Sequence, residues 1–144
     1  GKSNVLLDVQ IHSGNPADST LLPNVLDRIE SNYAKQVKSL VTDGGYASGP
    51  NRDYAQSKGI INIVFNKGVG SLKSIGSSKN MITRLQKWRS GMEAVISNYK
   101  RKFKMFRCNW KGRAHFDAKV LWSALAYNIR VMTGLVIGKL DPQP

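Results

Sequence analysis

Six residues near the middle of the chain, Ile60 to Phe65, read Ile-Ile-Asn-Ile-Val-Phe and are dense in β-branched side chains. A short run of this kind predicts a strand that is buried on both faces of its sheet. Glycine precedes the run and a segment rich in Gly, Ser and Lys follows it, so the strand is short. Other elements of the fold must therefore pack against both faces of this sheet.

The elements expected around this strand alternate between strands and helices. The residues before Ser13 alternate in polarity, and Gly59 follows a helical segment as a terminating residue. Asp18 or Ser19 is the expected N-cap of the first helix. The sequence predicts strands over residues 4–11, 37–42 and 60–65, and helices over residues 17–34, 50–59, 81–103 and 116–137. This order implies an α/β fold, with the apolar last helix covering the sheet.

One stretch interrupts this alternation. Residues 66–80 are rich in glycine, serine and lysine and hold few apolar side chains. We expect a flexible basic insertion here, within a single domain that spans residues 1–144.

Charge limits the partners that the chain can have. Lysine and arginine number 22 against 9 acidic residues, which gives a formal net charge of +13 and favours a polyanionic partner, nucleic acid first. No apolar run approaches about 18 residues, so we expect no membrane-spanning segment. A single cysteine, Cys108, excludes an internal disulfide and predicts a reducing, cytoplasmic compartment.

Two of the nine acids have positions that suit metal-dependent chemistry. Asp43 follows the predicted strand 37–42, where open α/β sheets carry functional residues, although an Asp-Gly turn explains it equally well. Glu93 shares one narrow helical face with Arg89 and Lys100. That arrangement suits a metal ligand beside phosphate-binding cations, or an ordinary surface ion pair. Phosphodiester chemistry commonly uses two divalent ions about 3.5–4 Å apart, held by such carboxylates.

Several motifs together resemble a known family, bacterial insertion-sequence transposases with a DDE, ribonuclease-H-like catalytic domain. The likeness covers nearly the whole chain and includes the order of elements. The motifs that carry it are Asn15-Pro16-Ala17-Asp18-Ser19, Val41-Thr42-Asp43-Gly44-Gly45-Tyr46, Gly59-Ile60, Arg89-Ser90-Gly91-Met92-Glu93, Lys100-Arg101-Lys102-Phe103 and Trp122-Ser123-Ala124-Leu125-Ala126-Tyr127-Asn128.

The resemblance implies roles for particular residues. Asp43 matches the second catalytic aspartate and Glu93 the catalytic glutamate of the family, which together would hold Mg²⁺ or Mn²⁺ in a two-metal site. Arg89 and Lys100 match the cations that contact transposon-end DNA, whereas Gln86 stands where the family has tyrosine. The implied partners are DNA, as transposon ends and target, and a second copy in a homodimer.

The resemblance also implies that a catalytic residue is missing. The first family aspartate lies on the first strand of the sheet, well before the Asn15-Pro16 turn, and here a single predicted strand precedes that turn. Asp8 lies on that strand, but its spacing fits the third strand of the fold. We therefore expect a ribonuclease-H-like mixed sheet flanked by helices that lacks its first strand, an inactive fragment, and a sheet edge prone to association.

A basic run suits binding to the DNA backbone. Aromatic residues are interleaved with it, as in a phosphate track with ring contacts. Besides Arg89, the candidate DNA-binding residues are Lys100, Arg101, Lys102, Lys104, Arg107, Lys111 and Arg113. Two other interpretations stay open: a basic nucleic-acid-binding module without chemistry, and a folded remnant without specific binding.

Overall fold

A computed structural model describes residues 4–66, 70–72, 74–103 and 111–140. The chain forms two compact units. One, here called the nested unit, is the continuous segment His12–Gly91, and the other, the split unit, combines Gly1–Ile11 with Met92–Pro144. Each unit is described by itself.

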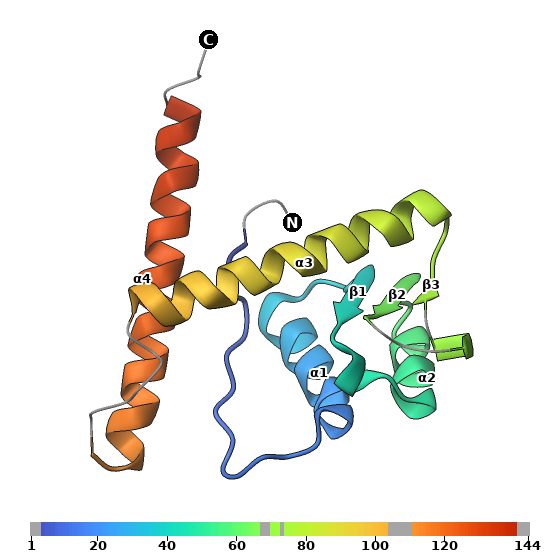
Figure 1. The fold of residues 1–144 in the computed structure, drawn as a ribbon, viewed down its shortest axis with the longest axis horizontal. Coiled ribbons are helices and arrows are strands. Elements are labelled where there is room, and N and C mark those ends of the chain that lie inside the picture. Colours follow the sequence, from blue (N-terminus) through green and yellow to red (C-terminus); the bar gives the residue numbers. More distant parts are fainter. Residues whose placement is uncertain (1–3, 67–69, 73, 104–110, 141–144) are drawn as a thin grey trace. The chain divides into compact units, whose positions relative to one another are not determined.

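The nested unit contains a small mixed sheet. Strand β1 (Ser39–Thr42) pairs in parallel with β2 (Asn62–Phe65), and β3 (Ser74–Ile75) pairs antiparallel with β2. The strand order is β1-β2-β3, and helices α1 (Leu22–Tyr33) and α2 (Gly49–Ser57) accompany the sheet (Figure 1). The predicted α/β class, with a mixed sheet and helices, is confirmed in this form.

The central strand β2 is buried along its whole length, as its composition predicts. Ile63, Val64 and Phe65 are at most 2% exposed, and Asn62 is 6% exposed. The Asn62 side chain donates to Ser39 Oγ at 3.2 Å and accepts from the Ser77 backbone N–H at 2.9 Å. Its amide therefore has partners inside the core, where an unpaired polar group would be costly.

Helix α1 begins later than predicted. A 3-10 helix, η1 (Asp18–Thr20), comes first, and α1 starts at Leu22 without a side-chain hydrogen bond at its N-cap, Leu21. The prediction that Asp18 or Ser19 caps this helix is therefore wrong. Asp18 and Ser19 lie inside η1 and precede the N-cap position, so neither accepts from the first N–H groups of α1. Leu22 and Leu26 pack in one core cluster with Ala55 of α2, with Ile60, which lies between α2 and β2, and with Ile63 and Phe65 of β2.

Helix α2 has the boundaries that local signals predict. Ser48 caps it by accepting a hydrogen bond from the Asn51 N–H at 3.2 Å, and Pro50 lies in the first turn. Gly59, just after the C-cap Lys58, has φ +75°, a conformation that favours glycine. The predicted terminating role of Gly59 is confirmed.

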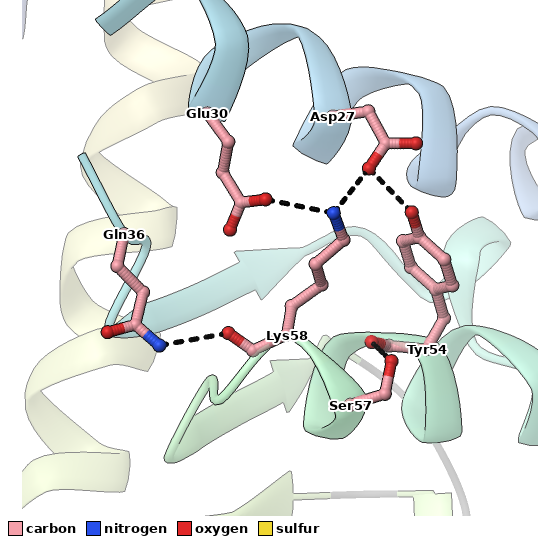
Figure 2. A network of polar contacts seen from close by, with 6 residues as sticks. All are labelled: Asp27, Glu30, Gln36, Tyr54, Ser57 and Lys58. Atoms are coloured by element: carbon pink, nitrogen blue, oxygen red, sulfur yellow. Dashed lines mark hydrogen bonds and ion pairs between the residues drawn. The ribbon is translucent and has the colours of Figure 1, made fainter. Parts of the chain in front are cut away.

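A polar network ties α1 to the end of α2 (Figure 2). Lys58 Nζ lies 2.7 Å from Asp27 Oδ1 and 2.9 Å from Glu30 Oε2, and Tyr54 Oη donates to the same Asp27 oxygen at 2.6 Å. The hydrogen bonds to Asp27 and Glu30 raise the pKa of Lys58, and those from Lys58 and Tyr54 lower the pKa of Asp27. Both shifts favour the charged forms.

The predicted insertion holds regular structure where it is described. Gly70–Leu72 forms a 3-10 helix, η3, Ser74–Ile75 forms β3, and α3 begins at Lys79 and ends at Lys102. Residues 67–69 and 73, with Lys67 and Lys73 among them, lie outside the described residues.

The predicted first strand, residues 4–11, is wrong as a strand. It forms no ladder with any strand in the described part of the chain. Instead the Asn128 side chain takes both backbone groups of Leu6, accepting from its N–H and donating to its C=O at 2.8 Å each. Tyr127 Oη also donates to the Asn4 carbonyl at 3.1 Å. A side-chain amide of helix α4 (Arg113–Leu140) therefore replaces the neighbouring strand that the alternation implied.

Helix α4 exposes most of its apolar residues, which corrects the expectation of a buried covering helix. Among its residues Ser123, Ala124 and Tyr127 are buried, whereas Trp122 is 66% exposed. Its other exposed apolar residues are Phe116, Leu121, Leu125, Ile129, Met132, Leu135, Val136 and Ile137. By length and composition alone, Arg113–Gly138 could cross a membrane. The sequence analysis overlooked this helix because a long apolar helix tolerates a few interspersed charges.

Candidate functional site

Asp43 lies immediately after β1, at the end of the sheet where β1 and β2 both finish. Thr42 is paired with Phe65, and the Asn66 N–H donates to the Thr42 carbonyl at 2.9 Å. Asp43 is the N-cap of a 3-10 helix, η2 (Gly44–Tyr46), and its Oδ1 accepts from the Gly44 N–H at 2.8 Å. The turn function that the Asp-Gly pair suggests is therefore present, together with the strand-end location.

The second oxygen of Asp43 has a cationic partner. Arg89 Nη2 lies 3.2 Å from Asp43 Oδ2, and the Arg89 side chain is 14% exposed against 56% for Asp43. Arg89 was expected to bind DNA and Asp43 to bind metal. The structure brings these two predicted site residues into contact, across 46 positions of the sequence.

A buried amide fixes the turn that carries Asp43. Asn51, 2% exposed, donates through Nδ2 to the Ser19 carbonyl at 2.8 Å and to the Tyr46 carbonyl at 2.9 Å. It thus joins η1 to η2, two turns far apart in the sequence. Sequence reasoning missed Asn51, because an asparagine inside a helical segment gives no signal of its distant partners.

Asp18 lies beside the same turn. A Cβ atom at Gly45 would be 2.5 Å from Asp18 Oδ2, so only glycine leaves room for this carboxylate. Burial, together with the charges of Asp18 and Asp43, raises the pKa of the Tyr46 phenol. The carboxylates of Asp18 and Asp43 therefore both disfavour the ionised form of the Tyr46 phenol. Asp18, which was expected to cap a helix, belongs to the Asn15-Pro16-Ala17-Asp18-Ser19 motif that carried the resemblance.

Glu93 is an exposed residue of α3 and belongs to the split unit. It follows Arg89 by four residues in the same continuous helix, so the helical spacing predicted for the pair is present. The last turn of α3 carries Lys100, Arg101 and Lys102, all exposed, and cations there also interact favourably with the helix dipole.

The remaining candidate cations have mixed positions. Lys111 is exposed, whereas Arg113 is engaged within the split unit. Its Nε lies 2.7 Å from Asp117 Oδ1, and its Nη2 donates to the Ile11 carbonyl at 3.3 Å. Arg113 therefore has local partners besides any DNA. Lys104 and Arg107 lie outside the described residues, as does Cys108.

The described residues do not form a ready metal site. Asp43 offers the hard oxygen ligands that Mg²⁺ prefers, but both of its oxygens already have partners, the Gly44 N–H and Arg89. No group of three or more His, Cys, Asp or Glu side chains in the described part of the chain could hold an ion. The arrangement as it stands is a capped turn with an ion pair.

A comparison with protein families identifies the chain. The model of the family described as "Transposase DDE domain" matches residues 1–129. The chain therefore belongs to the DDE transposase family, as the motifs indicated. This family suggests DNA transposition by enzymes of the nuclease and strand-transferase kind, which generally use divalent metals and have DNA as partner. Comparisons with curated proteins and with solved structures give no match.

Proposed function

We propose that this chain is the carboxyl-terminal part of a DDE transposase catalytic domain, which in its complete form cleaves and joins DNA strands at transposon ends. The observation that carries the proposal is the family match over residues 1–129, together with Asp43 at the end of β1. In open α/β sheets this end of the strands is where functional residues gather.

The sheet supports a ribonuclease-H-like fold that lacks its first strand. Strand β1, which precedes Asp43, pairs with β2 alone among the described residues, so its other edge has no strand there. The residues of β1 are only partly buried, whereas all four of β2 are buried. A strand bearing the first catalytic aspartate would complete this edge.

Asp43 and Glu93 are the residues that we assign to Mg²⁺ or Mn²⁺ in the complete enzyme. Asp43 is exposed and lies beside Arg89 in the nested unit, and Glu93 is assigned by its match to the family motif. Two carboxylates without the third are a poor cage for two ions. We therefore expect the isolated chain to be inactive in strand cleavage.

DNA is the partner that the charge supports. The net charge of +13 favours a polyanion, and Lys100, Arg101 and Lys102 present a run of exposed cations at the end of α3. If five to eight phosphates are neutralised, the log–log slope of affinity against salt is about −5 to −7. As a transposase, the protein would work as a homodimer in the bacterial cytoplasm.

The test is a combined binding and cleavage assay on duplex DNA. The chain should bind a labelled duplex with the steep salt dependence given above, and should not nick it with Mg²⁺ or Mn²⁺. A chain that binds DNA weakly, with a shallow salt slope, would overturn the proposed partner. Cleavage that disappears in Asp43→Ala would support the enzyme class and overturn the proposed inactivity.

The capped turn supports a second candidate, a basic DNA-binding module without chemistry. Asp43 already serves as an N-cap and as an ion-pair partner, two structural tasks that explain its presence. Mn²⁺ titrations of wild type, Asp43→Ala and Glu93→Ala separate the two candidates. Equally weak titrations of all three, with DNA present as well as absent, would leave the binding module.

A further inference from the structure

Helix α4 turns one face toward the rest of the split unit. Ser123, Ala124 and Tyr127 are at most 9% exposed. The Tyr99 phenol of α3 donates to the Val120 carbonyl at 2.9 Å, and the Tyr127 ring packs edge-on to the Tyr99 ring with the centroids 6.0 Å apart. These contacts fix which side of α4 faces inward, so the opposite side points away from its own unit.

Five apolar side chains form a row on that opposite side. They follow one another at spacings of three, four, three and four residues. At about 100° per residue, they fall within an arc of about 80° that is centred opposite the buried residues. The row, here called the α4 seam, consists of Trp122, Leu125, Ile129, Met132 and Val136, which are 66%, 47%, 53%, 47% and 56% exposed.

The α4 seam carries no charge. The charged residues of α4 from 117 to 138 are Asp117, Lys119 and Arg130, and each lies about 100° or more from the centre of the seam. Phosphate groups therefore find no cation within the seam, although the chain as a whole has a net charge of +13. The chemistry of this face suits an apolar partner.

The carboxyl-terminal part of α4 is not covered by its own unit. Every residue from 132 to 138 is exposed, although Met132, Leu135, Val136 and Ile137 are apolar. Helices in water owe most of their stability to packing, and contiguous exposed apolar surface marks an interaction site. This part of α4 therefore requires a partner.

The spacing of the seam indicates a second helix. Alternation of three and four residues is the pattern with which two helices interlock their side chains at a crossing angle of about 20°. A membrane-spanning helix would have to be apolar on all sides, whereas the Asn128 amide of α4 holds the backbone of Leu6 on its other side. The partner is therefore a protein helix rather than lipid.

The seam is complementary to itself in an antiparallel pair. A two-fold axis level with Tyr127 brings Trp122 opposite Met132 of the partner subunit. The same axis brings Leu125 opposite Ile129 of the partner subunit. An aromatic ring thus meets a flexible thioether, which is a favourable contact, whereas a parallel pair would set tryptophan against tryptophan.

We propose that the α4 seam binds the α4 seam of a second copy as an antiparallel helix pair. With the flanking Leu121 and Leu135, the seam offers on the order of 600 Å² of apolar surface per copy, so a pair buries about 1,200 Å². This area is the lower end for specific interfaces, and we expect a dissociation constant in the micromolar range. The inference goes beyond the proposed function, because it names the surface that pairs, and the pairing requires neither DNA nor a metal ion.

Sedimentation velocity of the 144-residue chain, from about 1 to about 200 µM, measures the association. Ile129→Glu places a charge in the middle of the seam, and Leu125→Glu repeats the test at a second position. Ile137→Glu is the matched control: Ile137 is on the same helix and 57% exposed, but lies about 100° from the centre of the seam. Circular dichroism confirms that each variant folds.

Wild type should pass from monomer to dimer within that concentration range. Ile129→Glu and Leu125→Glu should weaken association by about 30-fold or more, because each pair contains the buried charge twice. Ile137→Glu should change it by less than about twofold. Added salt should strengthen the pairing, since it screens the repulsion between two copies of charge +13, whereas it weakens binding to DNA.

The antiparallel direction has a measurement of its own. A spin label on Ile137→Cys, in a chain that also carries Cys108→Ser, reports the distance between the two copies by double electron–electron resonance. At a rise of about 1.5 Å per residue, an axis level with Tyr127 separates the two labels by about 30 Å or more, whereas a parallel pair brings them within about 20 Å. The shorter distance would overturn the antiparallel pairing.

A chain that stays monomeric over the whole concentration range overturns the inference, and so does association that Ile129→Glu leaves unchanged. A monomer that binds phosphatidylcholine vesicles through Ile129 also overturns it, and assigns the seam to a lipid surface. Failure of the proposed function has a different signature. In that case the chain binds duplex DNA weakly, with a shallow salt slope, while the seam still pairs.

Discussion

The Asn51 amide joins the two turns on which Asp43 and Asp18 lie, and Asn51→Leu tests its contribution. Leucine keeps nearly the same volume but has no donor, so the change removes the hydrogen bonds to Ser19 and Tyr46 without opening a large cavity. Asn51 is 2% exposed, and both lost bonds are short, at 2.8 and 2.9 Å.

The loss of stability comes from the Ser19 and Tyr46 carbonyls, which lose their hydrogen-bond donor. Each backbone carbonyl that loses its donor in a buried place costs about 1–3 kcal/mol. Ser19 and Tyr46 are partly buried, so water can compensate in part and the lower end of the range applies to each. We expect Asn51→Leu to lower the free energy of unfolding by about 2 kcal/mol.

Urea denaturation followed by circular dichroism measures this loss, with the slope against denaturant unchanged. Asp53→Ala, in the same helix, is the control: the Asp53 side chain is 63% exposed and paired with Arg52, so its loss should stay within about 0.5 kcal/mol. Equal effects of the two substitutions would refute the account of Asn51. Amide chemical shifts should also move at both turns in Asn51→Leu alone.

Three further outcomes are expected. Gly59→Ala should lower the free energy of unfolding in urea by about 1 kcal/mol, because φ is +75° there and the added methyl meets Gln36 Nε2. Lys58→Met should lower the urea midpoint near neutral pH. That difference should shrink below about pH 4: the pKa of Asp27 is lowered from 3.8, so its stabilising charge is lost as pH falls through the folded value. Lys100→Ala should weaken duplex binding at every sequence tested and reduce the salt slope by about 1.

Local signals predicted β1, β2 and α2, but not β3, which lies in the segment expected to be a flexible insertion. The β-branched run of β2 is buried as expected, and Ser48, Pro50 and Gly59 mark the ends of α2 through the conformations that each favours. These signals act over a few residues, so the sequence contains them directly. The register of β1 against β2 then places Asp43 at the strand end.

The errors concern partners that lie far away in the sequence. Alternation over residues 4–11 predicts two faces but does not specify what pairs with the backbone, and here the Asn128 amide does so. The helical face of Arg89 was predicted, whereas its pairing with Asp43 was not, because helical spacing says nothing of residues outside the helix. For the same reason the sequence did not predict the hydrogen bonds of Asn51 to Ser19 and Tyr46, or the position of Asp18 beside Gly45.

The order in which the chain is synthesised matters for its two units. His12–Gly91 is continuous and could fold as soon as it leaves the ribosome, whereas the split unit needs both ends of the chain. Leu6 is made early, but the Asn128 amide that holds its backbone emerges 122 residues later. Until translation passes that asparagine, the backbone of Leu6 lacks the side-chain partner that holds it in the folded chain.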